Sequence, residues 1–244
     1  MEPYSAPYPN PAVMPILECR GLTKCYGTIP ALNGVTLSIP QGRVVGLLGP
    51  NGSGKTTLIK LVAGLLQPTS GEALILGEKP GPSSKARVSY LPERPYFSPS
   101  MKVNEALAFF ADFYLDFDRL LAEDMLARLQ VPIAAPMSTL SKGTKEKVQL
   151  VLVMARRSAL YLLDEPIGGV DPAARDFILG TIIANYHRDS TILISTHLVS
   201  DVEQVLDDFI FLQYGSVAMY SSPQLVREQT GRSLDQYFRE AYRC

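Results

Sequence analysis

One short segment constrains the fold of this chain more than any other: Gly49-Pro-Asn-Gly-Ser-Gly-Lys-Thr-Thr57. The continuously apolar stretch before it, Val44–Leu48, predicts a buried strand, and helical spacing over 56–64 predicts a helix after it. In a glycine-rich turn between a strand and a helix, successive backbone N–H groups point inward around an anion. The segment therefore predicts an α/β fold with a phosphate-binding turn.

Each residue type in this segment, called the P-loop below, has a chemical reason to be there. Glycines let the backbone turn tightly, and the helix that follows adds the positive end of its dipole. Lys55 brings a mobile full charge to the outer phosphates of a nucleotide, and the Thr56 hydroxyl suits Mg²⁺. The residues expected to bind the nucleotide here are Gly49, Pro50, Asn51, Gly52, Ser53, Gly54, Lys55, Thr56 and Thr57.

Two further apolar stretches end in polar residues that suit chemistry at a phosphate group. Tyr161–Leu163 runs into Asp164 and Glu165 before a proline, and His197 follows the stretch Thr191–Ser195. In such sheets the strand ends lie along the edge where phosphate ligands bind. We therefore predict that Asp164 reaches the Mg²⁺ shell, that Glu165 takes a proton from an attacking water, and that His197 contacts the outermost phosphate.

The rest of the pattern separates strands from helices. Short apolar stretches between glycines and prolines predict strands over 16–46, whereas residues 101–157 carry apolar positions at helical spacing, broken at Pro132 and Pro136. A hairpin is predicted over 209–220, and the chain after it is predicted to be helical. Strands that alternate with helices favour a mainly parallel sheet covered on both faces.

Composition excludes several classes of protein. Lys and Arg number 23 against 24 for Asp and Glu, so the chain offers no general positive field for nucleic acid. A content of 46% hydrophobic and 19% charged residues is typical of a folded chain with a sizeable core. Three cysteines without a CxxC or a Cys/His cluster predict neither a disulfide framework nor structural zinc, and favour a reducing compartment.

The sequence predicts neither a membrane span nor a signal peptide. Its apolar runs, such as Val148–Ala155, are shorter than the roughly 18–20 residues that a bilayer requires. The N-terminus lacks a basic start and an apolar core, and its prolines and tyrosines predict an extended or disordered leader over residues 1–14. We therefore expect a chain that meets a membrane only through a partner.

Taken together, these features resemble the nucleotide-binding subunit of an ATP-binding cassette (ABC) transporter over about residues 17–220. The resemblance includes the stretch 32–42 ahead of the P-loop. It implies a P-loop NTPase core with a mainly parallel sheet, a small antiparallel β subdomain and an inserted helical subdomain at about residues 100–157. The implied boundaries are an ATPase domain over 15–221 and a short helical tail over 222–244.

The resemblance also implies roles for residues outside the P-loop. Tyr26 is the aromatic residue on which adenine stacks, and Asp171 belongs to a loop that contacts a second subunit. Ser141 and Gly143 lie in the signature segment, residues 140–144. In the family, this segment of one chain holds the γ-phosphate of the ATP that the other chain binds.

The signature segment departs from the family pattern, because it contains Leu-Ser-Lys-Gly-Thr in place of Leu-Ser-Gly-Gly-Gln. Ser141 is expected to cap the helix that follows. The side chains of Lys142, Lys145 and Lys147 crowd the start of that helix, with only Glu146 opposing them, and cations there oppose the helix dipole. An anion bound in front of the helix would offset this cost; a solvated lysine cluster is the alternative.

A second departure is Glu93, which stands where the family normally has Gln. A carboxylate is a good ligand for a hard cation, so we expect Glu93 to ligate or sense Mg²⁺. Neither departure removes Glu165 or His197, and the site is expected to hydrolyse ATP. Both departures and the short tail resemble the bacterial branch that serves export-type permeases.

The function implied by the resemblance is Mg²⁺-dependent ATP hydrolysis that drives a separate transmembrane permease. Two chains, identical or different, pair head to tail around ATP, and hydrolysis lets the dimer open. The family's permease docks near Glu93–Ser98 and Phe109–Tyr114, where Tyr96 and Phe97 are either anchors or ordinary packing residues. The implied location is cytoplasmic, peripheral on the inner face of the cell membrane through the permease.

Two alternatives stay open on these grounds. A soluble single-cassette ABC ATPase that acts on a cytosolic complex would use the same site without a permease. A nucleotide-sensing module would bind ATP without turnover. A two-cassette translation factor would need a second P-loop, which the sequence lacks, and a DNA-repair relative would need a long coiled-coil insertion between the P-loop and the signature segment.

Overall fold

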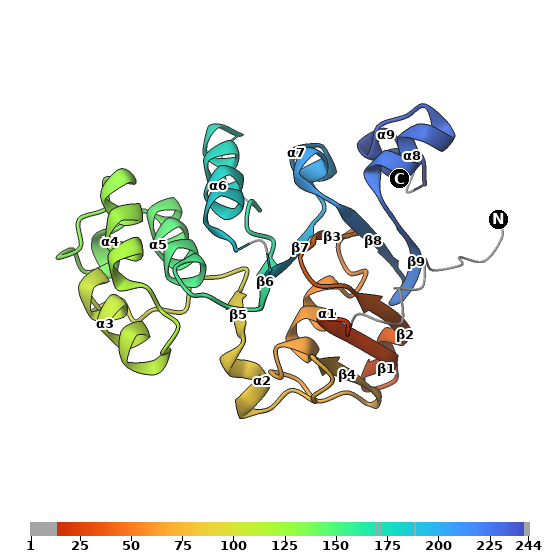
Figure 1. Cartoon of the computed structure of the whole chain (residues 1–244), viewed down its shortest axis with the longest axis horizontal. Coiled ribbons are helices and arrows are strands. Elements are labelled where there is room, and N and C mark those ends of the chain that lie inside the picture. Colours follow the sequence, from red (N-terminus) through yellow and green to blue (C-terminus); the bar gives the residue numbers. More distant parts are fainter. Residues whose placement is uncertain (1–13, 169, 171, 188, 242–244) are drawn as a thin grey trace.

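The structure is a computed structural model that describes residues 14–168, 170, 172–187 and 189–241 (Figure 1). The leader predicted for residues 1–14 lies outside the described residues except for Met14, and Asp171 also lies outside them. Two sheets with helices around them make up the described part of the chain.

The larger sheet has six strands in the order β5-β6-β7-β3-β8-β9. Their bounds are Val88–Leu91 (β5), Leu160–Asp164 (β6), Thr191–Thr196 (β7), Val44–Leu48 (β3), Asp208–Gln213 (β8) and Ser216–Ser221 (β9). Each neighbouring pair is parallel except the β8–β9 hairpin. The predictions of a mainly parallel sheet and of a hairpin near its end are confirmed.

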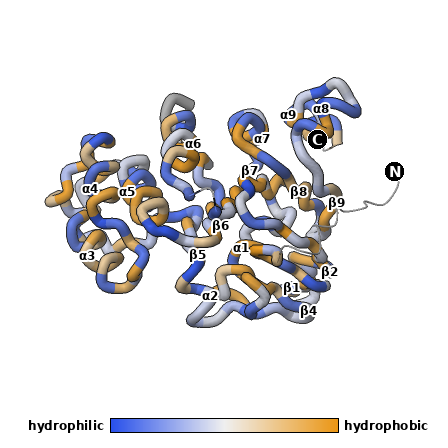
Figure 2. Tube along the Cα trace, viewed as in Figure 1, coloured by the Kyte–Doolittle hydropathy of each residue, from blue (hydrophilic) through white to orange (hydrophobic). Residues whose placement is uncertain are grey.

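Strands β3, β6 and β7 are buried along their whole length. Their side chains alternate between two hydrophobic clusters: Leu47 and Leu162 belong to one, and Leu48 and Leu163 belong to the other. This alternation follows from the two-residue period of a strand. Figure 2 shows the hydrophobic positions gathered where the sheet and the helices meet, as expected for a sheet covered on both faces.

The carboxyl ends of these three strands form the edge that positions the site. Leu48 is paired with Thr196, and Asp164 is paired with Ser195, across neighbouring strands. The chain segments that follow these strands therefore begin at the same level. They are the P-loop after β3, the acidic residues at the end of β6, and the segment after β7.

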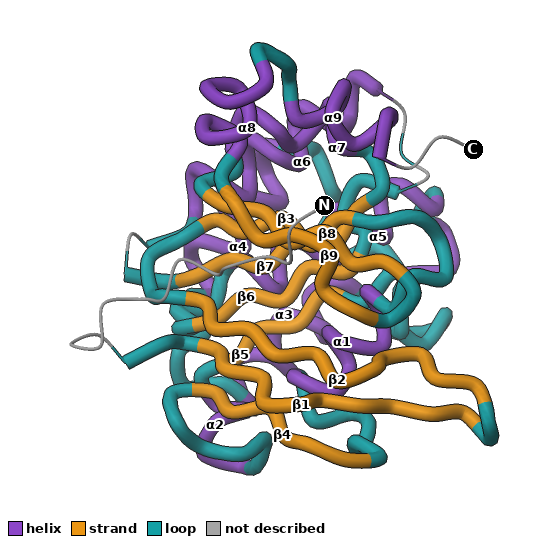
Figure 3. Tube along the Cα trace, turned by 90° about the vertical axis from the view of Figure 1, so that its right-hand side faces the viewer, coloured by secondary structure: helices purple, strands orange, loops and turns teal. Residues whose placement is uncertain are grey.

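The smaller sheet is antiparallel, in the order β2-β1-β4. Its strands are Ile29–Ile39 (β2), Leu17–Tyr26 (β1) and Ser70–Ile75 (β4). Helix α1 (Lys55–Val62) contacts strands of both sheets and lies between them (Figure 3). This sheet is the small antiparallel part that the family resemblance implies.

The middle of the chain is helical, as its spacing predicts. Helices α3 (Val103–Phe113), α4 (Arg119–Arg128) and α5 (Lys142–Met154) lie together at one end of the molecule (Figure 1). The other helices are α2 (Pro82–Ala86), α6 (Pro172–Asn185), α7 (Val199–Val202), α8 (Pro223–Thr230) and α9 (Leu234–Ala241), with short 3-10 turns at Met137–Thr139 and Glu203–Val205. Among the residues that the structure describes, no helix combines the length and the apolar character needed to span a bilayer.

A buried arginine ties the helical end to the larger sheet. Arg156 is 3% exposed and donates hydrogen bonds to the carbonyls of Ala86 (2.7 Å) and Val88 (2.6 Å). The same guanidinium pairs with Asp116 (3.0 Å) and lies 3.8 Å from the centre of the Tyr114 ring. Because Tyr114 and Asp116 belong to the connection between α3 and α4, this side chain joins the helices to the edge strand β5.

Candidate functional site

The backbone of the P-loop follows a path that only glycine can take at two points. At Gly54 the dihedral φ is 107°, and an added Cβ would lie 2.5 Å from the carbonyl oxygen of Ala31. An added Cβ at Gly49 would lie 2.4 Å from the carbonyl oxygen of Leu212. The loop therefore packs directly on the β2 and β8 backbones, and α1 begins at Lys55 immediately after the second of these glycines.

Lys55 supplies a buried positive charge at the floor of this loop. Its side chain is 6% exposed, and Nζ donates hydrogen bonds to the carbonyls of Gly49 (2.8 Å) and Pro50 (3.2 Å). Nζ also lies 3.4 Å from a carboxylate oxygen of Glu165. A buried ammonium group that lines an open cavity suits an incoming anion.

The cavity in front of the P-loop has a volume of about 1030 Å³. This is the size of a pocket for a ligand as large as a nucleotide. The predicted site residues that line it are Asn51, Gly52, Gly54, Lys55, Thr56, Thr57, Glu93, Glu165 and His197. Folding thus gathers residues from the P-loop, the segment after β5 and the ends of β6 and β7 around one space.

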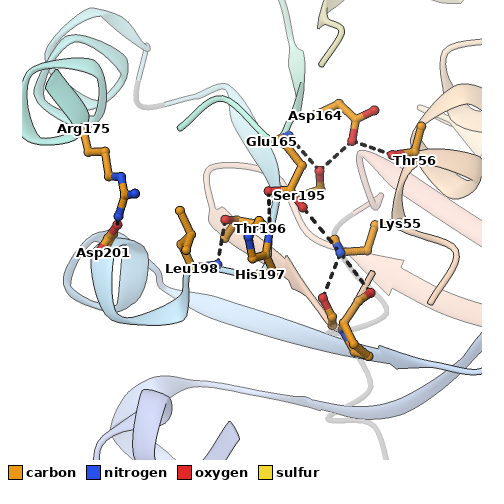
Figure 4. A network of polar contacts seen from close by, with 12 residues as sticks. Lys55, Thr56, Asp164, Glu165, Arg175, Ser195, Thr196, His197, Leu198 and Asp201 are labelled. Carbon is orange, nitrogen blue, oxygen red and sulfur yellow. Dashed lines mark hydrogen bonds and ion pairs between the residues drawn. The ribbon is translucent and has the colours of Figure 1, made fainter. Parts of the chain in front are cut away.

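Asp164 lies beside α1 and is not among the residues that line this cavity. Its Oδ1 accepts hydrogen bonds from the hydroxyls of Thr56 (3.0 Å) and Ser195 (2.7 Å), as Figure 4 shows. Burial raises the pKa of Asp164; the two hydrogen bonds oppose this rise, and the charges of Glu165 and Glu93 add to it. The carboxylate is therefore held in place in a site that disfavours its negative charge.

Glu165 lies between two basic side chains. One carboxylate oxygen is 3.4 Å from Lys55 Nζ, and the other is 3.1 Å from His197 Nδ1 (Figure 4). The backbone of Glu165 has φ of 50°, a left-handed conformation that is uncommon for residues with a side chain. Its N–H donates to the carbonyl (3.1 Å) and hydroxyl (3.0 Å) of Ser195, which holds this turn in place.

Several predicted site residues lie elsewhere. Gly49, Pro50 and Ser53 belong to the P-loop but do not line the cavity. Tyr26 also does not line it: its side chain is 52% exposed at the end of β1, with Lys24 Nζ 5.6 Å from the ring centre.

The signature segment lies at the N-terminus of α5. Ser141 is exposed and Gly143 is half-buried there. From the same helix start, Lys142 and Glu146 line the cavity of their own chain. Asp171 lies outside the described residues.

Ser195 and Arg94 are among the contributors to the site that sequence reasoning missed. Ser195 bonds both Asp164 and Glu165, and its only signal was a hydroxyl residue within an apolar strand, two positions before His197. Arg94, which follows Glu93 in the chain, also lines the cavity. Its only signal in the sequence was the alternation of charge at these two positions.

Comparison with known proteins gives consistent matches across most of the chain. The family model described as "ABC transporter" matches residues 32–168. The ABC transporter ATP-binding protein YtrB of Bacillus subtilis (strain 168) is 33% identical over 205 residues, which cover 83% of this chain and 70% of YtrB. The Nod factor export ATP-binding protein I of Ralstonia nicotianae is 30% identical over 234 residues, 92% of this chain and 73% of that protein.

A solved structure supports the same relationship in three dimensions. A protein described as the ATP binding subunit of an ABC transporter superposes with a TM-score of 0.81 at 31% sequence identity. The superposition covers 92% of this chain and 98% of that one. The likeness therefore includes both sheets and the helical end, together with the strand edge that carries the cavity.

Proposed function

This chain belongs to the family of ABC transporter ATP-binding subunits, and from that premise we propose that it hydrolyses ATP, with Mg²⁺, to drive a separate permease. One observation carries the proposal. A continuous set of contacts joins Thr56, Asp164, Ser195, Glu165 and His197 along one edge of the sheet. This set combines an anion site, oxygen ligands for a cation and a positioned base.

The phosphates of ATP bind in the P-loop. Backbone N–H groups of the loop and the N-terminus of α1 surround them, and Lys55 contributes its ammonium group to the β- and γ-phosphates. Lys55 shifts its contacts from the carbonyls of the loop to the ligand. Tyr26, exposed at the end of β1, stacks on the adenine ring.

The donor set at the edge of the cavity fits Mg²⁺. Thr56 and Glu93 line the cavity with a hydroxyl and a carboxylate, and Asp164 lies directly behind Thr56. All are oxygen donors, the kind that Mg²⁺ prefers. These residues would hold the ion, which would offset the negative charge of the phosphates while the γ-phosphoryl group is transferred.

Glu165 is the general base of the reaction. Its carboxylate takes a proton from a water whose oxygen forms a bond to the γ-phosphorus, and the bond from that phosphorus to the β,γ-bridging oxygen breaks. The products are ADP and phosphate. His197 contacts the γ-phosphate and orients the Glu165 carboxylate, a role supported by its 3.1 Å contact.

Two chains enclose each ATP. The N-terminus of α5, with Ser141 and Gly143, binds the γ-phosphate held by the other chain, and Asp171 contacts that chain near the same place. ATP thus joins the two subunits until hydrolysis removes the γ-phosphate. The partner is a second copy or a related ATPase.

The permease binds a groove between the helical end and the larger sheet. This groove has a volume of about 370 Å³ and its lining includes Leu65, Tyr90, Tyr96, Phe109, Phe110 and Tyr114. Its mainly apolar walls suit an apolar segment of a membrane protein. Since relatives named Nod factor export ATP-binding protein I match most of this chain, we assign the transporter to the export type, with the ATPase at the inner face of the cell membrane.

Two substitutions test the reaction. Lys55→Ala should weaken ATP binding at least about thirtyfold, since removing one partner of a buried charged contact costs about 2 kcal/mol or more. Glu165→Gln should leave ATP affinity within about twofold, lower hydrolysis by about 10²–10⁴-fold, and produce a dimer that persists in ATP. Calorimetry, phosphate release and light scattering measure these three quantities.

The control variant is Glu123→Gln, which removes a carboxylate of the exposed Arg119 pair on α4. It should match the wild type in binding, turnover and oligomeric state. Hydrolysis at the wild-type rate by Glu165→Gln would overturn the assignment of the base.

A further inference from the structure

A glutamine is buried in the middle of the helix that begins at the signature segment. Gln149, on α5, is 1% exposed and lies between the buried apolar residues Val148 and Leu150. Its Nε2 donates a hydrogen bond to the carbonyl of Pro92 (3.2 Å), the residue directly before Glu93. A buried amide is costly unless its donor and acceptor are both bonded, so its second polar atom also requires a partner.

That second atom has no protein partner. Gln149 Oε1 is buried and accepts no hydrogen bond from the residues that the structure describes. The same holds for Asp164 Oδ2, the oxygen that bonds neither Thr56 nor Ser195. Asp164 is also 1% exposed, so bulk water does not satisfy it.

Both residues line one small cavity. Its volume is about 20 Å³, and it lies where α5, the segment after β5 and the segment after β6 meet. The polar residues in its lining are Glu93, Glu146, Gln149, Asp164 and Glu165. The two residues that carry the unsatisfied acceptors therefore line the same small space, and they come from different elements.

The size and chemistry of this cavity suit one water molecule. A buried water needs at least about 10–15 Å³ of such volume and two to four polar partners. Water has two protons to donate, and both orphan atoms are acceptors. The acidic lining disfavours an anion.

We propose that this cavity holds one water that donates to Gln149 Oε1 and Asp164 Oδ2, and that Gln149 is a positioning residue for the cation-binding side of the site. Gln149 joins α5 to Glu93 through the Pro92 carbonyl and to Asp164 through the water. This inference rests on the proposed function, in which the N-terminus of α5 binds the partner's nucleotide. A displacement of α5 would then shift both Glu93 and Asp164.

The first test is a crystal structure of the full chain without nucleotide, at a resolution that shows ordered water. We expect one water within hydrogen-bond distance of Gln149 Oε1 and Asp164 Oδ2. An empty cavity, or a water that contacts neither atom, overturns the proposal. This test depends on no variant and on no ATPase activity.

The second test uses Gln149→Met, which keeps an unbranched side chain of similar length and removes both polar contacts. The matched control is Ser89→Ala, which removes another buried hydrogen bond between β5 and α5, from Ser89 Oγ to the Val153 carbonyl (2.9 Å). Both variants lose a contact of the same helix. Of the two contacts, only that of Gln149 links α5 to Glu93 and Asp164.

Gln149→Met should bind ATP without Mg²⁺ as the wild type does, and should need about tenfold more Mg²⁺ for half-maximal hydrolysis, with a lower kcat at an unchanged KM for ATP. The tenfold figure is the usual effect of removing a group that orients a metal ligand. Ser89→Ala should keep the wild-type Mg²⁺ dependence. Equal Mg²⁺ dependence and kcat in Gln149→Met and the wild type, or the same change in both variants, overturns the role of Gln149. If the wild type neither binds nor hydrolyses ATP, the proposed function itself fails.

Discussion

Asp164 and Glu165 are neighbours in the chain, yet the fold gives their side chains different surroundings. Asp164 is 1% exposed and accepts two hydroxyl hydrogen bonds on one oxygen. The Glu165 carboxylate lies between Lys55 and His197 at the cavity. A strand that ends between them explains the difference, because Asp164 is its last residue and Glu165 begins the turn.

The raised pKa of Asp164 gives a stability prediction. Between its ordinary and raised pKa the native chain binds more protons than the unfolded chain, so the free energy of unfolding falls as pH rises through that window. Asp164→Asn removes the buried charge and keeps an oxygen that accepts from Thr56 and Ser195. The variant should melt about 2–4 °C higher at neutral pH and hydrolyse ATP about 10- to 100-fold more slowly.

Differential scanning calorimetry across pH measures this gain. The difference in melting temperature between Asp164→Asn and the wild type should shrink as pH falls through the raised pKa, because the wild-type carboxyl is then neutral as well. A gain that stays constant with pH, or a variant that melts lower, would refute the argument from burial.

At the scale of elements, the start of α5 balances its positive charges locally. Lys142 lies 3.8 Å from Glu146, and Lys147 Nζ lies 5.8 Å from the centre of the Phe177 ring. The predicted cap is confirmed, since Ser141 Oγ accepts a hydrogen bond from the Thr144 N–H (3.1 Å). Two of the three lysines thus have a partner within the chain, Glu146 for Lys142 and Phe177 for Lys147. The anion expected in front of the helix stays a prediction.

The effect of Ser141 on the stability of α5 can be measured separately from its proposed role in dimer formation. Ser141→Ala and Ser222→Ala each remove a serine cap, because Ser222 Oγ accepts from the Leu225 N–H (3.2 Å) at the start of α8. Both variants should lose about 1 kcal/mol of stability in urea unfolding. Only Ser141→Ala should lose the ATP-dependent dimer, measured by light scattering in the Glu165→Gln background. Equal dimer formation in both would remove Ser141 from the interface.

At the scale of the whole molecule, one segment borders two cavities. Of the residues after β5, Glu93 and Arg94 line the nucleotide cavity, whereas Pro92 and Tyr96 line the apolar groove next to the helical end. Arg156 lines this groove too and binds both β5 and the connection between α3 and α4. A partner in the groove would therefore contact the segment that also lines the nucleotide cavity.

Removing an aromatic side chain from the groove should weaken permease binding and leave ATP binding unchanged. Phe109→Ala acts on a 48% exposed ring that lines the groove, and Leu120→Ala removes a 79% exposed side chain that lies outside it on α4. Recovery of the permease with the tagged chain from native membranes should fall at least about tenfold for Phe109→Ala alone. Equal recovery of the permease with both variants would place its binding site elsewhere.

Much of this molecule was predictable from local sequence. The glycine spacing of the P-loop, the apolar stretches that become β3, β6 and β7, and the helical spacing of 101–157 each depend on neighbours within one element. Lys55, Glu165 and His197 line one cavity at the shared carboxyl edge of the strands, as expected for a parallel sheet. Their catalytic roles stay predictions. Ser195 and Gln149 could not be found in this way, because each bonds residues of other elements, and Arg94 could not because the cavity that it lines forms only on folding.

By itself the sequence determined the order of the elements, the phosphate-binding turn and the acidic strand end, because backbone conformation and burial follow from residue type and spacing along a short segment. Only the tertiary structure decided which side chains meet. Thr56 and Asp164 are 108 positions apart and touch because β3 and β6 both pair with β7. The cavity shared by Gln149 and Asp164 likewise exists only where several elements pack together, since a void is a property of packing between elements.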